Sequence, residues 1–442
     1  MTVLCRIGVA LAALLSTLSA AAVAAPYDAA FIAWAKAQAV PLPACASIRE
    51  GADYRAIAAS LGRARVVALG EPVHGAHEPL TLRNCLFRYL VEEQGFTAIA
   101  LESGLHESRR LHDYAAGGAG DAREIARNGF TWGFWRYPEN IELLEWIRAY
   151  NLDSAHDRKV AIYGIDVSGG DADGAWARAR VTLDEALDYL ARAEPTRSAP
   201  LRENIEPFLG RFSAPAYRAL TERERAELRR SVAQLLRFFD TRRPALVAAS
   251  SREDYDWARQ NVVAAQQLQV LFDVSDVPDP AGRLLPGDYR ADAARDKAMA
   301  ANALWALGQE GPTGRLLVFA HNGHIMNAYT RGGIWAVYEL APAAMGIHLR
   351  HSLGQGLLIV GTSSPTRVEG AGEPGTIERA LARVGGQRFL LDIRSASGGP
   401  AGWLNDKQSI SVNYTTESLV TPMRAFDLLL FFPLLTPSSS PP

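Results

Sequence analysis

The stretch VVALGEPVHGAH, residues 66–77, decides the fold and the site that we expect from this sequence. It opens with four apolar residues, two of them valine, which predict a short buried strand. The glycines and proline that follow end the strand and shape a loop. Glu71 and His74 stand at this point, where burying an acid and an imidazole is costly. The stretch therefore predicts a strand that delivers two functional side chains.

Three further apolar runs end in the same way, with a titratable residue directly after the run. They are residues 97–101 before Glu102, 160–165 before Asp166, and 316–320 before His321, which His324 follows. In open parallel sheets, ligands bind outside the carboxyl ends of the strands. If the four strands are neighbours, their terminal side chains face one crevice.

The segments between these runs predict helices. Apolar residues repeat at helical spacing over 80–94, Gly95 follows as a helix end, and the next strand completes a βαβ unit. From about residue 176 to 308 no run is typical of a strand, and helical spacing prevails. We therefore expect an α/β fold, a mostly parallel sheet flanked by helices and interrupted by an all-helical insertion.

This interpretation divides the chain into five parts. Residues 25–170 form the first part of the α/β core, 171–310 the helical insertion, and 311–435 the second part of the core. Residues 436–442 consist of serine and proline after the first residue, which predicts a disordered tail. Residues 1–24 precede the core as a leader.

The leader has the features of a signal peptide. Arg6 supplies a positive charge, an apolar stretch follows, and residues 22–24 (AVA) fit the small-x-small cleavage pattern. The alternative is an uncleaved membrane anchor, for which the apolar run is short. We therefore expect export to a periplasm or the exterior, with no membrane contact after cleavage.

Export changes the meaning of the cysteines. Cys5 leaves with the leader, and Cys45 and Cys85 remain as a pair in an oxidising compartment. Two unpaired thiols are the alternative, but Cys45 lies in a proline-rich loop that gains from tethering. We therefore expect a disulfide between them.

Charge and missing motifs restrict the function. Of 442 residues, 46 are lysine or arginine and 48 aspartate or glutamate, and a net charge of −2 gives no reason to expect a nucleic-acid partner. The sequence has no G-x-S-x-G elbow, no phosphate-binding glycine loop, no G-x-G-x-x-G turn and no H-E-x-x-H. Cys85 falls within a predicted helix without a nearby base, which argues against a cysteine nucleophile.

Histidine and carboxylate chemistry remains. A histidine can take a proton from water, and a carboxylate can orient it. His74 with Glu71 or Glu102, facing His321, His324 and Arg83, supplies the parts for direct hydrolysis of an ester without a covalent intermediate. The aromatic run 132–139 adds Trp132 and Trp135, which could line a substrate pocket or serve only as packing.

Several ordered motifs together resemble the erythromycin esterase family. They are G-E-x-x-H-G at 70–75, Arg83 nine residues after His74, Glu102, G-I-D at 164–166, W-I-R-x-Y-N at 146–151, Arg295 with Met299, A-H-N-x-H at 320–324, and Met345 with Gly346. The resemblance covers roughly residues 65–362. It implies an α/β fold with a helical insertion, a cleft between them, and hydrolysis of a macrolide lactone by water.

The resemblance also implies roles for residues. His74 matches the general base, and Glu71, Glu102, Arg83, His321 and His324 match other active-site positions. We expect these histidines and glutamates to be catalytic, no cofactor, and a small ester or lactone as substrate. Arg83, Arg295, Trp132 and Trp135 are the predicted substrate contacts, and Asp166 the predicted support. The oligomeric state stays open.

Other interpretations of the same residues remain. The cluster of His74, Glu102, His321 and His324 has the ligand types of a zinc or manganese site, so a metal-dependent hydrolase or a periplasmic metal- or haem-binding protein is possible. Glu71 and Glu102 could instead form a structural ion pair with Arg83, and Arg295 could be a solvated helix charge. We favour the catalytic interpretation because the pattern recurs at strand ends.

Overall fold

The fold was analysed in a computed structural model. It describes residues 27–61, 64–170, 176–274, 290–332, 340–366, 375–411 and 417–438. The predicted signal peptide, residues 1–24, lies outside these ranges. Among the described residues, no helix has the length and apolar character needed to span a bilayer.

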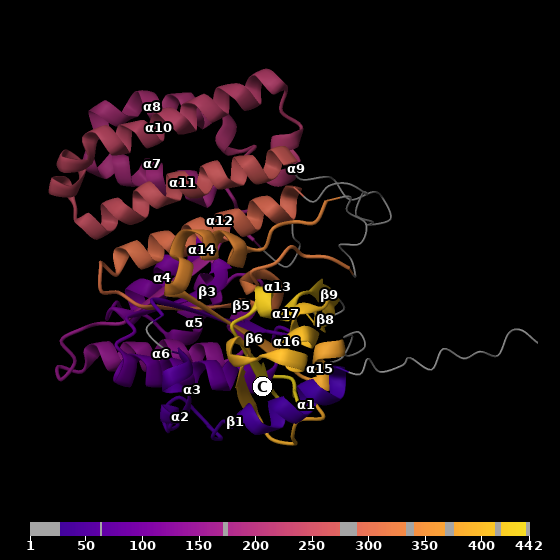
Figure 1. Cartoon of the computed structure of the whole chain (residues 1–442). Coiled ribbons are helices and arrows are strands. Elements are labelled where there is room, and N and C mark those ends of the chain that lie inside the picture. Colours follow the sequence, from indigo (N-terminus) through magenta and orange to yellow (C-terminus); the bar gives the residue numbers. More distant parts are fainter. Residues whose placement is uncertain are drawn as a thin grey trace, which may run out of the picture.

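A large mixed sheet forms the centre of the molecule (Figure 1). Its strands, in spatial order, are β1 (Val40–Pro41), β7 (Phe389–Asp392), β10 (Leu428–Phe431), β6 (Leu357–Ser363), β2 (Val66–Glu71), β5 (Leu316–His321), β3 (Ala98–Gly104) and β4 (Ala161–Asp166). Every pairing from β10 to β4 is parallel, while β7 runs antiparallel to its two neighbours. The predicted fold class, a mostly parallel sheet within an α/β protein, is confirmed.

The four strands that end in titratable residues are neighbours, in the order β2, β5, β3 and β4. Glu71 at the end of β2 is directly opposite His321 at the end of β5. The register between β3 and β4 shifts after Leu101, so that Gly104 pairs with Asp166. The carboxyl ends of these strands therefore meet at one edge, as their sequence pattern predicted.

Helices cover both faces of the sheet, and the strands from β10 to β4 are buried along nearly their whole length. Val67, Leu69 and Ile99 point into one core, and Val66 and Ala68 point into the other. The first core is built with α2 (Arg55–Leu61), α3 (His77–Gln94), α4 (Leu105–Ala115), α5 (Ala122–Gly129) and α6 (Pro138–Leu152). The second is built with α1 (Tyr27–Gln38), α12 (Arg290–Gln309), α14 (Met345–Leu353), α15 (Thr376–Leu381) and α16 (Gly398–Asn405).

Short elements connect these layers. They are η1 (Phe134–Arg136), α13 (Asn322–Ile325), η3 (Gly354–Gly356), η4 (Ile393–Ser395), α17 (Pro422–Ala425) and a hairpin of β8 (Gln408–Ser411) and β9 (Glu417–Val420). The hairpin matters for the site because Ser411 accepts a hydrogen bond from Asn322, next to His321.

The insertion is helical and has its own core. It comprises α7 (Val181–Ala193), α8 (Pro195–Leu209), α9 (Ala214–Arg218), α10 (Glu222–Ala249) and α11 (Arg252–Val274), stacked above the sheet in Figure 1. Helix α12 joins the two layers, because Ala298 packs in the insertion core while Met299 and Ala303 pack on the sheet. The predicted insertion, residues 171–310, therefore ends in a helix that belongs to both layers.

The chain after β10 differs from the disorder that we expected from residue 436 onward. Residues 436–438 run along the loop that follows His74, where the Ser438 N–H donates to the Gly75 carbonyl at 2.7 Å. The His77 N–H donates to the Thr436 carbonyl at 2.8 Å. Backbone hydrogen bonds fix this segment although it has few apolar side chains. Residues 439–442 lie outside the described residues.

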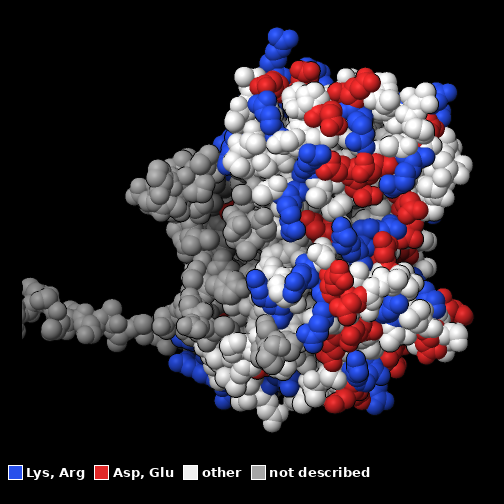
Figure 2. All heavy atoms as spheres, turned by 180° about the vertical axis from the view of Figure 1, so that it is seen from behind, with Lys and Arg blue, Asp and Glu red and all other residues white. Residues whose placement is uncertain are grey.

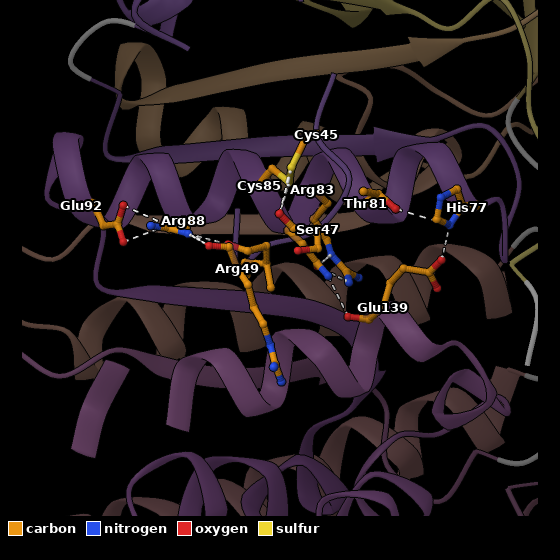
Figure 3. The surroundings of a disulfide bond; sticks show 12 residues. Cys45, Ser47, Arg49, His77, Thr81, Arg83, Cys85, Arg88, Glu92 and Glu139 are labelled. Carbon is orange, nitrogen blue, oxygen red and sulfur yellow. Dashed lines mark hydrogen bonds and ion pairs between the residues drawn. A yellow bond between two sulfur atoms is a disulfide. The ribbon is translucent and has the colours of Figure 1, made fainter. Parts of the chain in front are cut away.

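Cys45 and Cys85 form the expected disulfide, with their Cα atoms 6.5 Å apart (Figure 3). The bridge ties the loop before α2 to the middle of α3, the helix that starts directly after the His74 loop.

The surface carries both signs of charge. Figure 2 shows acidic and basic side chains interspersed over one face of the molecule. This distribution agrees with the near-neutral net charge, and the absence of a nucleic-acid partner stays a prediction.

Candidate active site

His74 and Glu71 form a close pair at the end of β2. The distance between His74 Nδ1 and Glu71 Oε1 is 2.5 Å, and both side chains are largely buried. Burial raises the pKa of Glu71 above its ordinary value, although the adjoining His74 opposes this shift. The carboxylate fixes the ring and leaves Nε2 directed toward the rest of the cluster.

Two glycines shape this loop. Gly75 has φ of +71°, and a Cβ there would lie 2.8 Å from the Tyr137 ring. At Gly70 a Cβ would lie 2.2 Å from Oδ1 of Asn322, the residue after His321. A side chain fits at neither Gly70 nor Gly75, so close packing explains why glycines flank Glu71 and His74 in the sequence.

Glu102, at the end of β3, lies at the centre of the cluster. Its Oε1 is 3.7 Å from His74 Nε2, 3.2 Å from His324 Nε2 and 3.1 Å from Arg295 Nη2. Its Oε2 accepts the backbone N–H of His321 at 2.9 Å. Burial opposes the charge of Glu102, but His324 and His74 outweigh it and hold the pKa well below its usual range. Glu102 is therefore an anion around which the cations gather.

His321 lies parallel to His74. The two rings stack with centroids 3.4 Å apart, and His321 is 7% exposed. Burial, together with the neighbouring His74, holds the pKa of His321 well below 6.5. His321 is therefore neutral at physiological pH.

His324 is in the opposite state. Its Nδ1 contacts a carboxylate oxygen of Asp296, and its Nε2 faces Glu102. Burial disfavours charge on this ring, but Asp296 and Glu102 outweigh it and raise the pKa of His324 to about 10. The two histidines that follow β5 are thus in opposite states: His321 is neutral, and His324 is protonated.

Arg295 connects the cluster to Asp166. Its guanidinium donates to Asp166 at 2.9 and 2.5 Å, and Trp132 Nε1–H donates to the same fully buried carboxylate at 2.9 Å. Trp132 has φ of +58°, a conformation that costs roughly 1 kcal/mol or more and persists only where contacts impose it. Asp166 is thus joined to the cluster through Arg295 and Trp132, and its supporting role stays a prediction.

The other two predicted substrate contacts are placed differently. Arg83 is 1% exposed, stacks on Phe319 at 4.8 Å and donates to Asn84. It lines a cavity of about 20 Å³ behind Glu71 and Glu102, which has room for water and not for a substrate. Burial lowers the pKa of Arg83 to about 10. This position favours support of the carboxylates over substrate contact.

Trp135 lies between two arginines, with the Arg127 and Arg136 guanidinium groups 4.9 and 5.0 Å from its ring. Among the described contacts, none joins Trp135 to the histidines. The neighbouring Phe134 is the aromatic residue that touches His74, edge to face at 4.7 Å.

Two residues of the cluster, Asp296 and Phe134, were not among the predicted site residues. Asp296 directly follows Arg295 on α12, so an acidic residue beside an arginine already assigned to the site was the signal. Phe134 lies in the aromatic run from which we selected the two tryptophans.

The cluster also contains two groups with metal-ligand atoms close together. Glu71, His74 and His321 form one group, and Glu102, His321 and His324 the other, each with one atom per residue within 4.8 Å of the rest. Neutral His321 is in the form that binds metals. The second group would have to displace a proton that Asp296 and Glu102 stabilise on His324. The first group is therefore the better candidate for an ion.

Fold and site together define an α/β protein with a helical insertion and a histidine–carboxylate cluster at the carboxyl edge of its sheet. The erythromycin esterase family model matches residues 91–434. The chain belongs to the erythromycin esterase family, which supports a hydrolytic enzyme of that type. The match includes Glu102, His321 and His324 and begins after Glu71 and His74.

Curated relatives agree with this membership. The chain is 26% identical to erythromycin esterase type II of Escherichia coli over 322 residues, covering 71% of this chain and 72% of the relative. It is 24% identical to erythromycin esterase type I of Escherichia coli over 298 residues, covering 67% and 70%.

Solved structures share the fold. A Bacillus cereus protein superposes with a TM-score of 0.75 at 23% identity, covering 94% of this chain and 99% of that protein. A mutant of erythromycin esterase EreC in its open conformation gives 0.66 at 18% identity, covering 88% and 96%.

Proposed function

We propose that this protein hydrolyses an ester or a macrolactone with water activated by His74. The pairing of His74 with Glu71 carries the proposal, because Glu71 accepts Nδ1–H and leaves Nε2 as the base. The Escherichia coli relatives are named as erythromycin esterases, which supports a macrolactone as the first substrate to test.

The remaining residues fit the needs of such a reaction. Glu102 is 3.7 Å from His74 Nε2, longer than a direct hydrogen bond, and in the proposed reaction Nε2 accepts a proton from an incoming water. Once His74 is protonated, the Glu71 and Glu102 carboxylates stabilise the imidazolium. Protonated His324 and Arg295 supply positive charge at Glu102 Oε1, the same oxygen that faces His74. Neutral His321 beside His74 can donate to a developing oxyanion. Water attacks the carbonyl directly as His74 takes its proton. When the ester C–O bond breaks, the protonated His74 returns a proton to the leaving alkoxide, so no covalent intermediate is required.

A metal-dependent hydrolase is the second candidate, because Glu71, His74 and His321 bring ligand atoms within 4.8 Å of one another. A metal there would use the same residues to lower the pKa of a bound water. Family membership supports either hydrolase over the metal- or haem-carrying protein that the sequence left open.

A substrate panel separates the two hydrolases. Erythromycin, other macrolactones and simple esters are incubated with the protein before and after dialysis against a chelator, alongside metal analysis. We expect turnover that the chelator leaves unchanged. Loss of turnover with the chelator, restored by a stoichiometric divalent metal, would establish the metal-dependent reaction, and no turnover on the whole panel would overturn the proposed function.

We further propose that the protein is exported. The leader-like composition of residues 1–24 and the disulfide between Cys45 and Cys85 support a periplasmic or secreted location. Cell fractionation with sequencing of the mature N-terminus tests this, and an intact N-terminus in the cytoplasm would contradict it.

A further inference from the structure

The segment of residues 436–438 docks against the loop that carries the proposed base. Pro437 pairs with Ala76 as an antiparallel bridge, flanked by the backbone bonds of Ser438 to Gly75 and of His77 to Thr436. The Thr436 N–H and hydroxyl both donate to the Glu78 carboxylate, at 2.8 and 2.7 Å. The loop from Gly75 to Glu78 thus has a partner at each residue.

Side chains extend this contact to α6. The Ser438 hydroxyl donates to Glu139 Oε2 at 2.6 Å, while Glu139 Oε1 lies 2.6 Å from His77 Nδ1 (Figure 3 shows the His77 side of this pair). Glu139 is 5% exposed, so its carboxylate is held between these two partners. The segment, the start of α3 and α6 therefore form one hydrogen-bonded unit.

The start of α3 depends on this unit for its cap. Ala76 occupies the N-cap and has no side-chain group to accept the first helical N–H. The Thr436 carbonyl accepts the His77 N–H instead. The segment of residues 436–438 thus caps the first N–H of α3, which the Ala76 side chain cannot do.

His74 lies immediately before this capped region. Gly75 has a positive φ, and its carbonyl is the acceptor for Ser438. A shift of the Gly75 peptide would rotate His74 away from Glu71, from which it is 2.5 Å. Displacement of a reacting group by about 1 Å can reduce a rate a hundredfold.

We propose that residues 436–438 are a positioning segment that fixes His74 for catalysis, an inference that rests on the proposed function. Thr436 and Ser438 do not touch the substrate. Their hydroxyls anchor the segment on Glu78 and Glu139, and the anchored backbone holds Gly75 and His77 in place. The segment sets the turnover rate and has little influence on substrate binding.

Matched substitutions test this role in the full-length protein with erythromycin as substrate. Thr436→Val with Ser438→Ala removes both hydroxyls, and Thr436→Ser with Ser438→Thr retains them. Thr241→Val with Ser352→Ala removes two hydroxyls that donate to backbone carbonyls within α10 and α14.

We expect Thr436→Val with Ser438→Ala to lower kcat by roughly tenfold, less than the hundredfold loss that a reacting group displaced by about 1 Å can cause. The KM of this variant should stay within about twofold of the wild-type value. The hydroxyl-retaining pair should restore kcat, and the pair on α10 and α14 should match the wild type. Equal kcat in the first pair and the wild type, or no rescue by the hydroxyl-retaining pair, would overturn the proposal.

Amide hydrogen exchange gives a readout that does not require turnover. The His77 and Ser438 amides should be protected in the wild type and exchange faster in the Thr436→Val, Ser438→Ala protein. If the wild type does not hydrolyse erythromycin, the proposed substrate fails, while this measurement still decides whether the segment holds the loop. Unchanged exchange would overturn the docking role whatever the activity.

Discussion

The imidazole rings of His74 and His321 stack with centroids 3.4 Å apart at the ends of the paired strands β2 and β5. Two imidazoles at this distance repel each other when both are charged. Since His321 stays neutral, the positive charge that develops on His74 during proton transfer is not stacked on a second cationic ring. The stacking therefore favours His74 as the ring that changes protonation in the proposed reaction.

His74→Asn should abolish most turnover without unfolding the protein. The amide cannot take a proton from water, and loss of a general base costs about 10²- to 10⁴-fold in rate. Asparagine keeps a polar group at this largely buried position that can still hydrogen-bond Glu71, so the melting temperature should change little. Turnover and thermal melting are measured beside His351→Asn, a substitution on the exposed side of α14. Wild-type kcat in the His74 variant would remove the residue from the mechanism.

Glu71→Gln should change the pH dependence of the reaction. Because burial raises the pKa of Glu71 above 4.5, the carboxylate is protonated as pH falls, at a higher pH than an exposed glutamate. Activity that needs the carboxylate is thus present above this pKa and lost below it. The variant should lose about a hundredfold in kcat at neutral pH and lack this acid step. Glu145→Gln, in an exposed pair with Arg49, is the control; superimposable pH profiles of the wild type and Glu71→Gln would contradict the assignment.

Asp296→Asn should alter how stability depends on pH. His324 has a pKa of about 10 in the folded protein and about 6.5 in an unfolded chain. A raised pKa gives stabilisation that is fully present below pH 6.5 and disappears as pH rises toward 10. Removing the Asp296 charge lowers the pKa of His324 in the folded protein. The wild type should lose unfolding free energy between pH 6.5 and 10, and the variant should lose about a few kcal/mol less over the same range.

Urea denaturation at several pH values between 6 and 10 measures this effect, with the exposed Asp406→Asn as the matched control. Parallel stability curves for the wild type and Asp296→Asn would show that His324 does not carry the proposed charge.

Much of the site could be predicted from the sequence because a parallel sheet obeys a local rule. Each of Glu71, Glu102, Asp166 and His321 follows its own apolar run, and the carboxyl ends of parallel strands share one edge. Gly75 was predictable as a turn after β2, whereas Gly70, which we expected to end the strand, lies within it and pairs with Ala320.

What could not be predicted depends on how distant elements pack. Asp296 reaches His324 only because α12 crosses from the insertion onto the sheet, which helical periodicity does not specify. Arg83 was expected to contact the substrate, but from α3 its guanidinium lies over the Phe319 ring. The docking of residues 436–438 relies on backbone groups and on two hydroxyls that donate to Glu78 and Glu139, partners that a serine- and proline-rich composition does not specify.

Reduction of the disulfide should destabilise the protein. The bridge between Cys45 and Cys85 spans 40 residues, and a closed loop of that length contributes about 4 kcal/mol by restricting the unfolded chain. Guanidinium unfolding with and without reductant measures the loss, and Cys45→Ser with Cys85→Ser should match the reduced protein. The same unfolding midpoint with and without reductant would mean that the bridge does not form in solution.

The position of β2 in the sheet has a consequence for biogenesis. Its two neighbours, β5 and β6, begin at residues 316 and 357, so a nascent chain holds this central strand unpaired until most of its length has been made. Such high contact order slows folding and leaves apolar strand edges open to aggregation. The proposed catalytic strand thus completes its pairing late in synthesis, and under the proposed export this delay would keep the chain in the unfolded state that translocation requires.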